Sequence, residues 1–121
     1  MLHAYQQQGG RIEWLVKKQT GHLRELLLAN TDEANAARMA HIGEAHYRYQ
    51  IAPVWIMGAY LRYLDHLLGI AHTHPRVRDA ERAPLEDALT KLVFRDMGLM
   101  LEGYWVAANQ ALAGERDKVS E

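Results

Sequence analysis

The sequence contains no cysteine, and this absence removes several classes of function at once. Without thiols the chain cannot form disulfides, hold an iron–sulfur cluster, ligate haem through a thiolate or attack a substrate through a cysteine nucleophile. Serine is almost absent as well, because Ser120 is the only one and it lies next to the last residue. A serine triad therefore has no suitable nucleophile in this chain.

Long apolar runs and a charge excess are also missing. No stretch approaches the roughly 20 apolar residues that a membrane helix needs, and the N-terminus has no secretory pattern. The chain has 14 Lys and Arg against 15 Asp and Glu, for a formal net charge of −1. This balance offers no basic surface for nucleic acid or anionic lipid. We expect a single cytoplasmic domain with neither a membrane nor a nucleic-acid partner, because 121 residues suffice for one core but not two.

What the sequence does have is apolar residues at helical spacing along nearly its whole length, so we predict an all-α fold. Asn30, Thr31 and Asp32 can end one helix and cap the next, while Pro53 and Pro84 suit the first turns of later helices. Residues 76–82 mix charges without apolar spacing and are predicted to form a loop. The resulting domain plan is a lead-in over 1–10, helices over 11–29, 34–48, 53–71 and 84–113, and a charged, frayed tail over 114–121.

The last predicted helix is apolar on more than one side. Leu92 and Val93 lie on one side, whereas Phe94, Leu101 and Trp105 extend the apolar surface around the helix. A helix that is apolar on two sides needs two packing partners. We expect one of these partners to be a second copy of the chain.

His46 is the residue whose surroundings point most clearly to chemistry. It follows Met39, Ile42 and Gly43 at spacings typical of one helix face, close to a break at Ala52-Pro53. The small residues Gly43 and Ala45 would leave space for a flat group, and the break would open a pocket. A single histidine in this setting suits an axial ligand to haem iron, whereas a structural zinc would need three or four converging ligands.

Apolar residues suited to a porphyrin wall occur on both helices that flank the break. Those on the first helix are Met39 and Ile42, and those on the second are Trp55 and Met57. The competing interpretation is that His46 is a core histidine whose ring nitrogens are hydrogen-bonded within the protein. Composition and spacing leave both interpretations open.

Other candidate sites are weaker. His72 and His74 could chelate a metal across a loop, but a third ligand is not evident. The paired Glu-x-x-His motifs of a di-iron bundle are absent, and Glu44-Ala-His46 has the wrong spacing for one helix face. Trp14, Trp55 and Trp105 are typical of core positions.

Three segments carry a resemblance to a known family. The segment from Ile42 to Tyr60, IGEAHYRYQIAPVWIMGAY, resembles the signature of the globin-coupled sensors, which are bacterial haem globins attached to chemotaxis-transducer or diguanylate cyclase output domains. Residues 15–23 resemble that family's E helix, and residues 91–105 resemble its last helix. The resemblance covers roughly residues 11–108.

This resemblance implies a globin-like fold with haem b as cofactor and His46 as the proximal iron ligand. It places Leu15 in the distal pocket, with Lys18 where relatives often carry a threonine and Ile56 where many carry a tyrosine. It further implies a diatomic gas ligand (oxygen, CO or NO), a homodimer through the last two helices and an output signalling domain on another segment. Movement of His46 on gas binding would pass through Pro53 into those helices. No enzymatic activity is implied.

The chain departs from the family at its N-terminus, where only ten residues precede the predicted E helix. The family's earlier helices bring a distal tyrosine that holds oxygen, and Tyr5 does not match that position. We therefore expect the E-to-H portion of a sensor globin, with weaker oxygen retention and CO binding less affected. The alternative is a haem-free, globin-like dimerisation module, because a half-open pocket would hold haem poorly.

Overall fold

A computed structural model of the chain describes residues 9–28 and 32–120. The chain divides into two units, residues 1–30 and 31–121. The described part of the first unit contains α2 (Gly9–Leu27), and that of the second contains α3 (Glu33–Arg48), α4 (Pro53–Thr73) and α5 (Asp79–Ser120). The residues that the structure describes include helices and turns but no strand, which confirms the predicted all-α fold.

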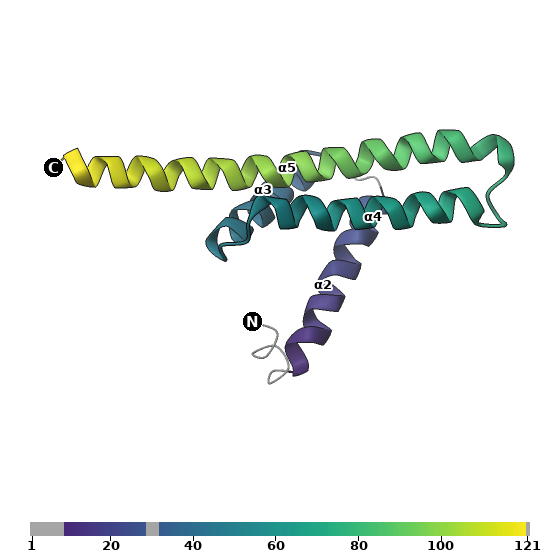
Figure 1. Cartoon of the computed structure of the whole chain (residues 1–121), viewed down its shortest axis with the longest axis horizontal. Helices are drawn as coiled ribbons and strands as arrows, with labels where there is room; N and C mark the ends of the chain where they lie inside the picture. The colour runs from purple at the N-terminus through teal and green to yellow at the C-terminus, as the bar shows by residue number, and fades with distance from the viewer. Residues whose placement is uncertain (1–8, 29–31, 121) are drawn as a thin grey trace. The chain divides into compact units, whose positions relative to one another are not determined.

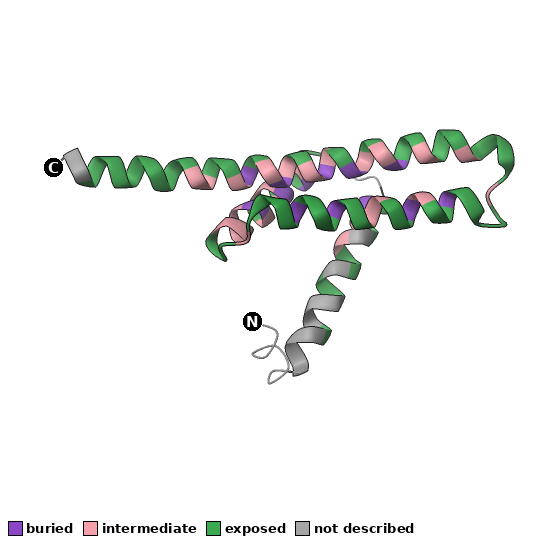
Figure 2. Cartoon of the chain, in the orientation of Figure 1, coloured by how far each residue is buried: buried purple, intermediate pink, exposed green. Residues whose placement is uncertain are grey.

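The second unit is a helical hairpin with a third helix across it (Figure 1). α4 and α5 run antiparallel side by side, and α3 also packs against α5. Buried residues lie where these helices meet, while much of the surface of α4 and of the C-terminal part of α5 is exposed (Figure 2). None of the described helices has the length and apolar content required to traverse a membrane.

Local sequence explains where α3 and α4 begin. Asp32 is the N-cap of α3, and its carboxylate accepts a hydrogen bond from the Asn35 backbone N–H at 2.8 Å, as predicted for this residue. Pro53 occupies the first turn of α4, where its missing N–H removes no helical bond, and Ala52 before it is extended. Asn30 and Thr31, predicted as the stop and the alternative cap, lie outside the described residues.

The N-terminal boundary of α5 differs from the prediction. Residues 76–82 were expected to form a loop and Pro84 to open the helix, but α5 begins at Asp79 and contains Pro84 in its second turn. Two acidic residues, Asp79 and Glu81, lie in the first turn and suit the positive end of the helix dipole. Charge at the helix end therefore outweighed the lack of apolar periodicity.

Two other boundaries also need correction. α5 continues to Ser120 through residues 114–120, which were predicted to fray, because Glu115, Arg116 and Lys118 in this segment are good helix formers. α2 begins at Gly9, inside the predicted lead-in, and ends at Leu27. Residues 1–8 of the lead-in and Ala29, the predicted last residue of that helix, lie outside the described residues.

One long-range hydrogen bond defines the register of the α4–α5 hairpin. Tyr60 on α4 donates to Asp96 on α5 at 2.6 Å. Four residues before Tyr60 and four after Asp96 stand Ile56 and Met100, both buried. Apolar side chains are thus buried in matched positions along both helices, which is how a helical hairpin removes its inner face from water.

The α3–α5 contact is made in a different way. A Cβ atom added at Gly43 of α3 would overlap the backbone of Met100 and Tyr104, and one added at Gly103 of α5 would overlap the backbone of Ala40. The two helices therefore touch backbone to backbone, which only glycine allows. Gly43 and Gly103 form what we call the glycine crossing.

Candidate functional site

His46 lies in the last turn of α3, and the backbone after it folds back over the helix end. The His46 carbonyl accepts a hydrogen bond from Ile51 N–H at 3.0 Å. Gln50 adopts a positive φ of 60°, a left-handed conformation that costs a non-glycine residue about 1 kcal/mol. This tight turn ends α3 and allows Pro53 to start α4 only seven residues after His46.

The imidazole of His46 has a defined orientation. Its Nδ1 lies 2.7 Å from the carbonyl oxygen of Ile42, one turn earlier on the same helix. Because a carbonyl only accepts, Nδ1 must carry the proton in this contact, and Nε2 of the neutral ring then has the lone pair. Histidines that bind metals are commonly oriented by such a second hydrogen bond. The ring is partly exposed, so it is not sealed inside the protein.

The structure gives two of the predicted site residues a different role. Met39 has no exposed surface, so nothing of it is available to a cofactor. Gly43 is buried at the glycine crossing, and the space expected beside it is filled by the backbone of α5. The small side chain at this position thus serves helix packing. Ile42 is half-buried and supplies the carbonyl that orients His46.

The predicted wall residues on α4 are exposed. Trp55 exposes 73% of its surface and Met57 49%, which is unusual for large apolar side chains so close to a histidine-bearing turn. On α2, Lys18 is exposed, whereas the side chain of Leu15 lies outside the described part of the chain. The structure thus places Trp55, Met57 and His46 on either side of one turn.

The second candidate metal site is not assembled. His72 Nδ1 lies 3.5 Å from a carboxylate oxygen of Glu86, and His74 Nδ1 accepts a hydrogen bond from the Arg76 backbone at 3.2 Å. Within residues 9–28 and 32–120, no group of three or more potential metal-ligating side chains converges. The described structure therefore provides no third ligand for a His72–His74 site.

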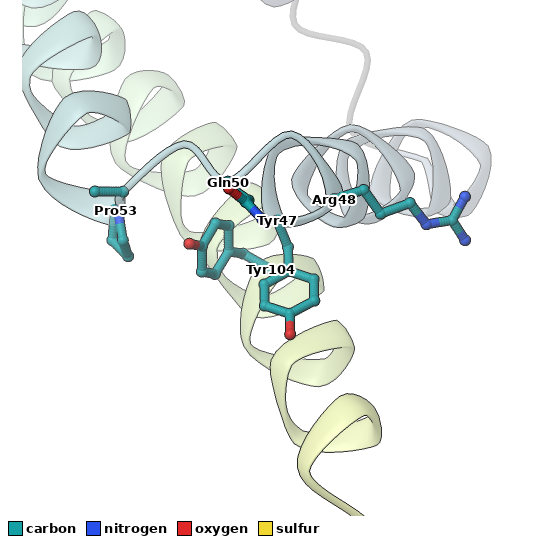
Figure 3. Close-up of a pocket in the computed structure, with 6 residues that line it drawn as sticks. Tyr47, Arg48, Gln50, Pro53 and Tyr104 are labelled. Carbon is teal, nitrogen blue, oxygen red and sulfur yellow. The ribbon is translucent and has the colours of Figure 1, made fainter. Parts of the chain in front are cut away.

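A hollow lies beside the His46 turn, at the break where the sequence predicted a pocket (Figure 3). It has a volume of about 440 Å³, is open to solvent, and is lined by Tyr47, Arg48, Gln50, Ala52, Pro53 and Tyr104. The rings of Tyr47 and Tyr104 meet edge to face, with centroids 5.4 Å apart. This aromatic contact ties the residue after His46 to α5.

A buried polar pair was missed. Tyr60 and Asp96 are 3% and 4% exposed, and burial together with the Asp96 carboxylate raises the pKa of Tyr60 well above its usual value. A signal was present in the sequence, because Asp96 falls between Val93 and Met100 on the apolar face of α5. An acidic residue on such a face indicates a buried partner.

Comparison with known proteins places these features in a family. The sequence model of the Protoglobin family matches residues 2–109, which is most of the chain. No curated protein and no solved structure matches. The matched range includes His46, the turn after it and the α4–α5 hairpin up to Asn109. The chain therefore belongs to the protoglobin family, a family of globin-type gas-binding domains.

Proposed function

We propose that this chain is a haem-binding sensor globin in which His46 is the axial iron ligand. The observation that carries this proposal is the hydrogen bond from His46 Nδ1 to the Ile42 carbonyl, because it places the proton on Nδ1 and leaves the Nε2 lone pair available for coordination. Globins typically bind haem, and a neutral imidazole is the donor that haem iron takes in this fold. The residues present thus fit the group.

We propose that the exposed apolar side chains near His46 contact the cofactor. Trp55 and Met57 would lose their solvent exposure against a flat apolar ring, which favours binding by about 25 cal/mol per Å² of apolar surface covered. Leu15 and Lys18 remain proposed cofactor contacts. Haem, when bound, would supply an iron atom that can take oxygen, CO or NO, and His46 would hold that iron.

The experiment is an absorption spectrum of the purified chain supplied with haem. We expect a Soret band in the wild type, its loss in His46→Ala and its return when imidazole is added to that variant. His41→Ala is the matched control, because His41 lies on the same helix but is exposed beside Glu44. A colourless wild type, or a full spectrum in His46→Ala, contradicts the proposal.

We further propose that the chain pairs with a second copy through α4 and α5. Exposed apolar residues recur at helical spacing as Val54 and Leu61 on α4 and as Phe94, Trp105 and Leu112 on α5. A Cβ atom at Gly58 or Gly98 would meet nothing within 4 Å, so helices of another molecule can approach closely there. An exposed apolar surface of this extent is typical of an interface.

Sedimentation analysis tests this pairing. We expect Phe94→Glu to weaken the dimer at least about tenfold, because a charge would have to be buried in the interface. Gln110→Glu adds the same charge to the same helix at an exposed polar position and is the control. A monomeric wild type would exclude the interface.

In this proposal the dimer passes the gas signal to an output partner such as a diguanylate cyclase or a chemotaxis transducer. A haem-free dimerisation module is the second candidate, favoured by the same exposed apolar residues. The two are separated by the spectrum, because the module predicts a stable dimer in material that stays colourless with haem.

A further inference from the structure

The hairpin and α3 share a polar cluster that the proposed function does not use. It consists of Asn35 and Arg38 on α3, Tyr60 on α4, and Arg95 and Asp96 on α5. Asn35, Tyr60 and Asp96 are buried, and buried polar side chains are costly unless they satisfy one another. This polar cluster therefore restricts how the three helices can be arranged.

The link between α4 and α5 is the strongest part of the polar cluster. The Tyr60 hydroxyl donates to the Asp96 carboxylate at 2.6 Å, and both residues are less than 5% exposed. A hydrogen bond to a charged acceptor is roughly twice as strong as one between neutral groups. This bond holds the hairpin in one register.

Two interactions link α3 to this pair: a hydrogen bond from Arg95, the residue before Asp96 on α5, and the positive charge of Arg38 on α3. Arg95 donates to the Asn35 side-chain oxygen at 2.9 Å. The positive charge of Arg38 acts on the Tyr60 hydroxyl and lowers its pKa, opposing the larger effect of burial. One guanidinium nitrogen of Arg38, Nη2, is buried and has no hydrogen-bond partner within the described structure. A third helix thus contributes a partly buried positive charge that acts on the Tyr60 hydroxyl.

The glycine crossing lies between this polar cluster and His46. Along α3, Gly43 is five residues after Arg38 and three before His46, or about 7.5 and 4.5 Å at 1.5 Å per residue. Because the backbones touch at Gly43, α3 cannot move closer to α5 there. A displacement of the His46 end that keeps this backbone contact in place tilts α3 about Gly43 and moves Arg38 in the opposite direction.

We propose that the polar cluster is a positioning latch that couples the His46 end of α3 to the α4–α5 hairpin. Asn35 and Arg38 on α3 interact with Arg95, Tyr60 and Asp96 on the hairpin, and these interactions fix the position of α3 relative to α4 and α5. This inference rests on the proposed function for the origin of the displacement. The coupling itself is a property of the protein chain and can be measured without haem. Arg38 and Tyr60 are positioning residues in this scheme, since neither touches His46.

A double-mutant cycle between Arg38→Met and Tyr60→Phe, measured as urea unfolding of haem-free chain, tests the latch. We expect the two changes to be non-additive by roughly 2- to 150-fold in the unfolding equilibrium constant. The control cycle replaces Tyr60→Phe with Tyr63→Phe, because Tyr63 lies three residues further along α4 and meets the Tyr60 ring edge-on. That cycle should be additive. Additivity in the Arg38–Tyr60 cycle would overturn the proposal.

Hydrogen–deuterium exchange of haem-loaded protein, with and without CO, provides a readout that stability alone would not change. In the wild type and in Tyr63→Phe we expect CO to alter exchange in α3 and in the hairpin. In Tyr60→Phe we expect the change to remain in α3 and to be lost from residues 53–73. A hairpin response that persists in Tyr60→Phe would contradict the latch.

Two outcomes separate this inference from the proposed function. If the wild type takes up no haem, the sensor proposal fails, and the unfolding cycle alone decides whether Arg38 and Tyr60 are coupled. If haem binds but the cycle is additive, the sensor proposal stands and the latch is wrong. Should Tyr60→Phe fail to fold, Asn35→Ala replaces it in a cycle with Arg95→Met, with non-additivity again expected and additivity again overturning the latch.

Discussion

α5 packs against α3 and against α4, and the two contacts differ in kind: the first is closest between backbones, and the second is made by side chains. Against α3 it presents Gly103, so that backbone meets backbone with no side chain between them. Against α4 it presents side chains of ordinary size, with Met100 and Ile56 buried at one level and Asp96 and Tyr60 hydrogen-bonded at the next. At the glycine crossing the first contact has no room to adjust, although side chains also meet beside it at Tyr47–Tyr104 and Asn35–Arg95. The second contact can repack within its volume. The difference indicates that α3 moves relative to α5 by tilting at the glycine crossing, whereas α4 and α5 keep a fixed register.

Adding a single methyl group at the glycine crossing should produce the largest effect. Gly43→Ala or Gly103→Ala would drive a Cβ into backbone atoms that cannot rotate away, so we expect a loss of about 3 kcal/mol or more in the free energy of unfolding. Gly114→Ala on α5 is the control, because nothing lies within 4 Å of that position. It should be neutral or more stable by up to about 1 kcal/mol. Equal effects at Gly103 and Gly114 in urea unfolding would show that the backbones do not touch.

Alkaline pH should weaken the second contact without affecting the first. Burial and Asp96 raise the pKa of Tyr60 in the folded chain, whereas in the unfolded chain it is near 10. Above pH 10 the unfolded state therefore binds fewer protons, and stability should fall by about 1.4 kcal/mol per pH unit from this group. Tyr60→Phe should lose this component of the slope, and Tyr49→Phe, at an exposed position, should keep it. Thermal unfolding between pH 9 and 11 checks the comparison.

A change of shape at constant volume should produce the smallest effect. Leu67 on α4 is buried seven residues after Tyr60, and Leu89 on α5 is buried seven residues before Asp96. Since these side chains belong to the adjustable contact, we expect Leu67→Met to cost less than about 1.5 kcal/mol. Truncation by Leu67→Ala should cost about 2–5 kcal/mol. If Leu67→Met is as harmful as Gly103→Ala in urea unfolding, the two contacts are equally rigid and the comparison fails.

The same contrast explains what the sequence could and could not predict. Apolar spacing and local signals such as Asp32 and Pro53 predicted four helices, since both act within a few residues along the chain. The start of α5 at Asp79 was missed because the prediction relied on the spacing of apolar residues, and the first turn of this helix is favoured by acidic residues instead. For the site, the spacing of apolar residues predicted that His46 lies near a helix end. Its hydrogen bond to the Ile42 carbonyl depends on the side-chain rotamer, which sequence spacing does not predict.

The glycine crossing and the polar cluster depend on which residues meet across helices. Gly43 was interpreted as space for a cofactor because a missing side chain looks the same whether a ligand or another backbone fills the gap. Tyr60 and Asp96 are 36 residues apart, and no local pattern links them. Knowledge of the hairpin register would have connected them, since a buried acid on one helix requires a donor at the same level on the other.

Arg82 has a consequence for how the chain acquires this structure. Its guanidinium donates to the carbonyls of Ala71 at 3.0 Å, His72 at 2.6 Å and His74 at 3.4 Å, so one side chain closes the end of α4 from the first turns of α5. All of these partners lie within 11 residues of Arg82, and such short loops close fast and with little entropy loss. The hairpin can therefore begin to form at this chain reversal and extend along α4 and α5 toward Tyr60 and Asp96. α3 would then pack last, against the completed hairpin.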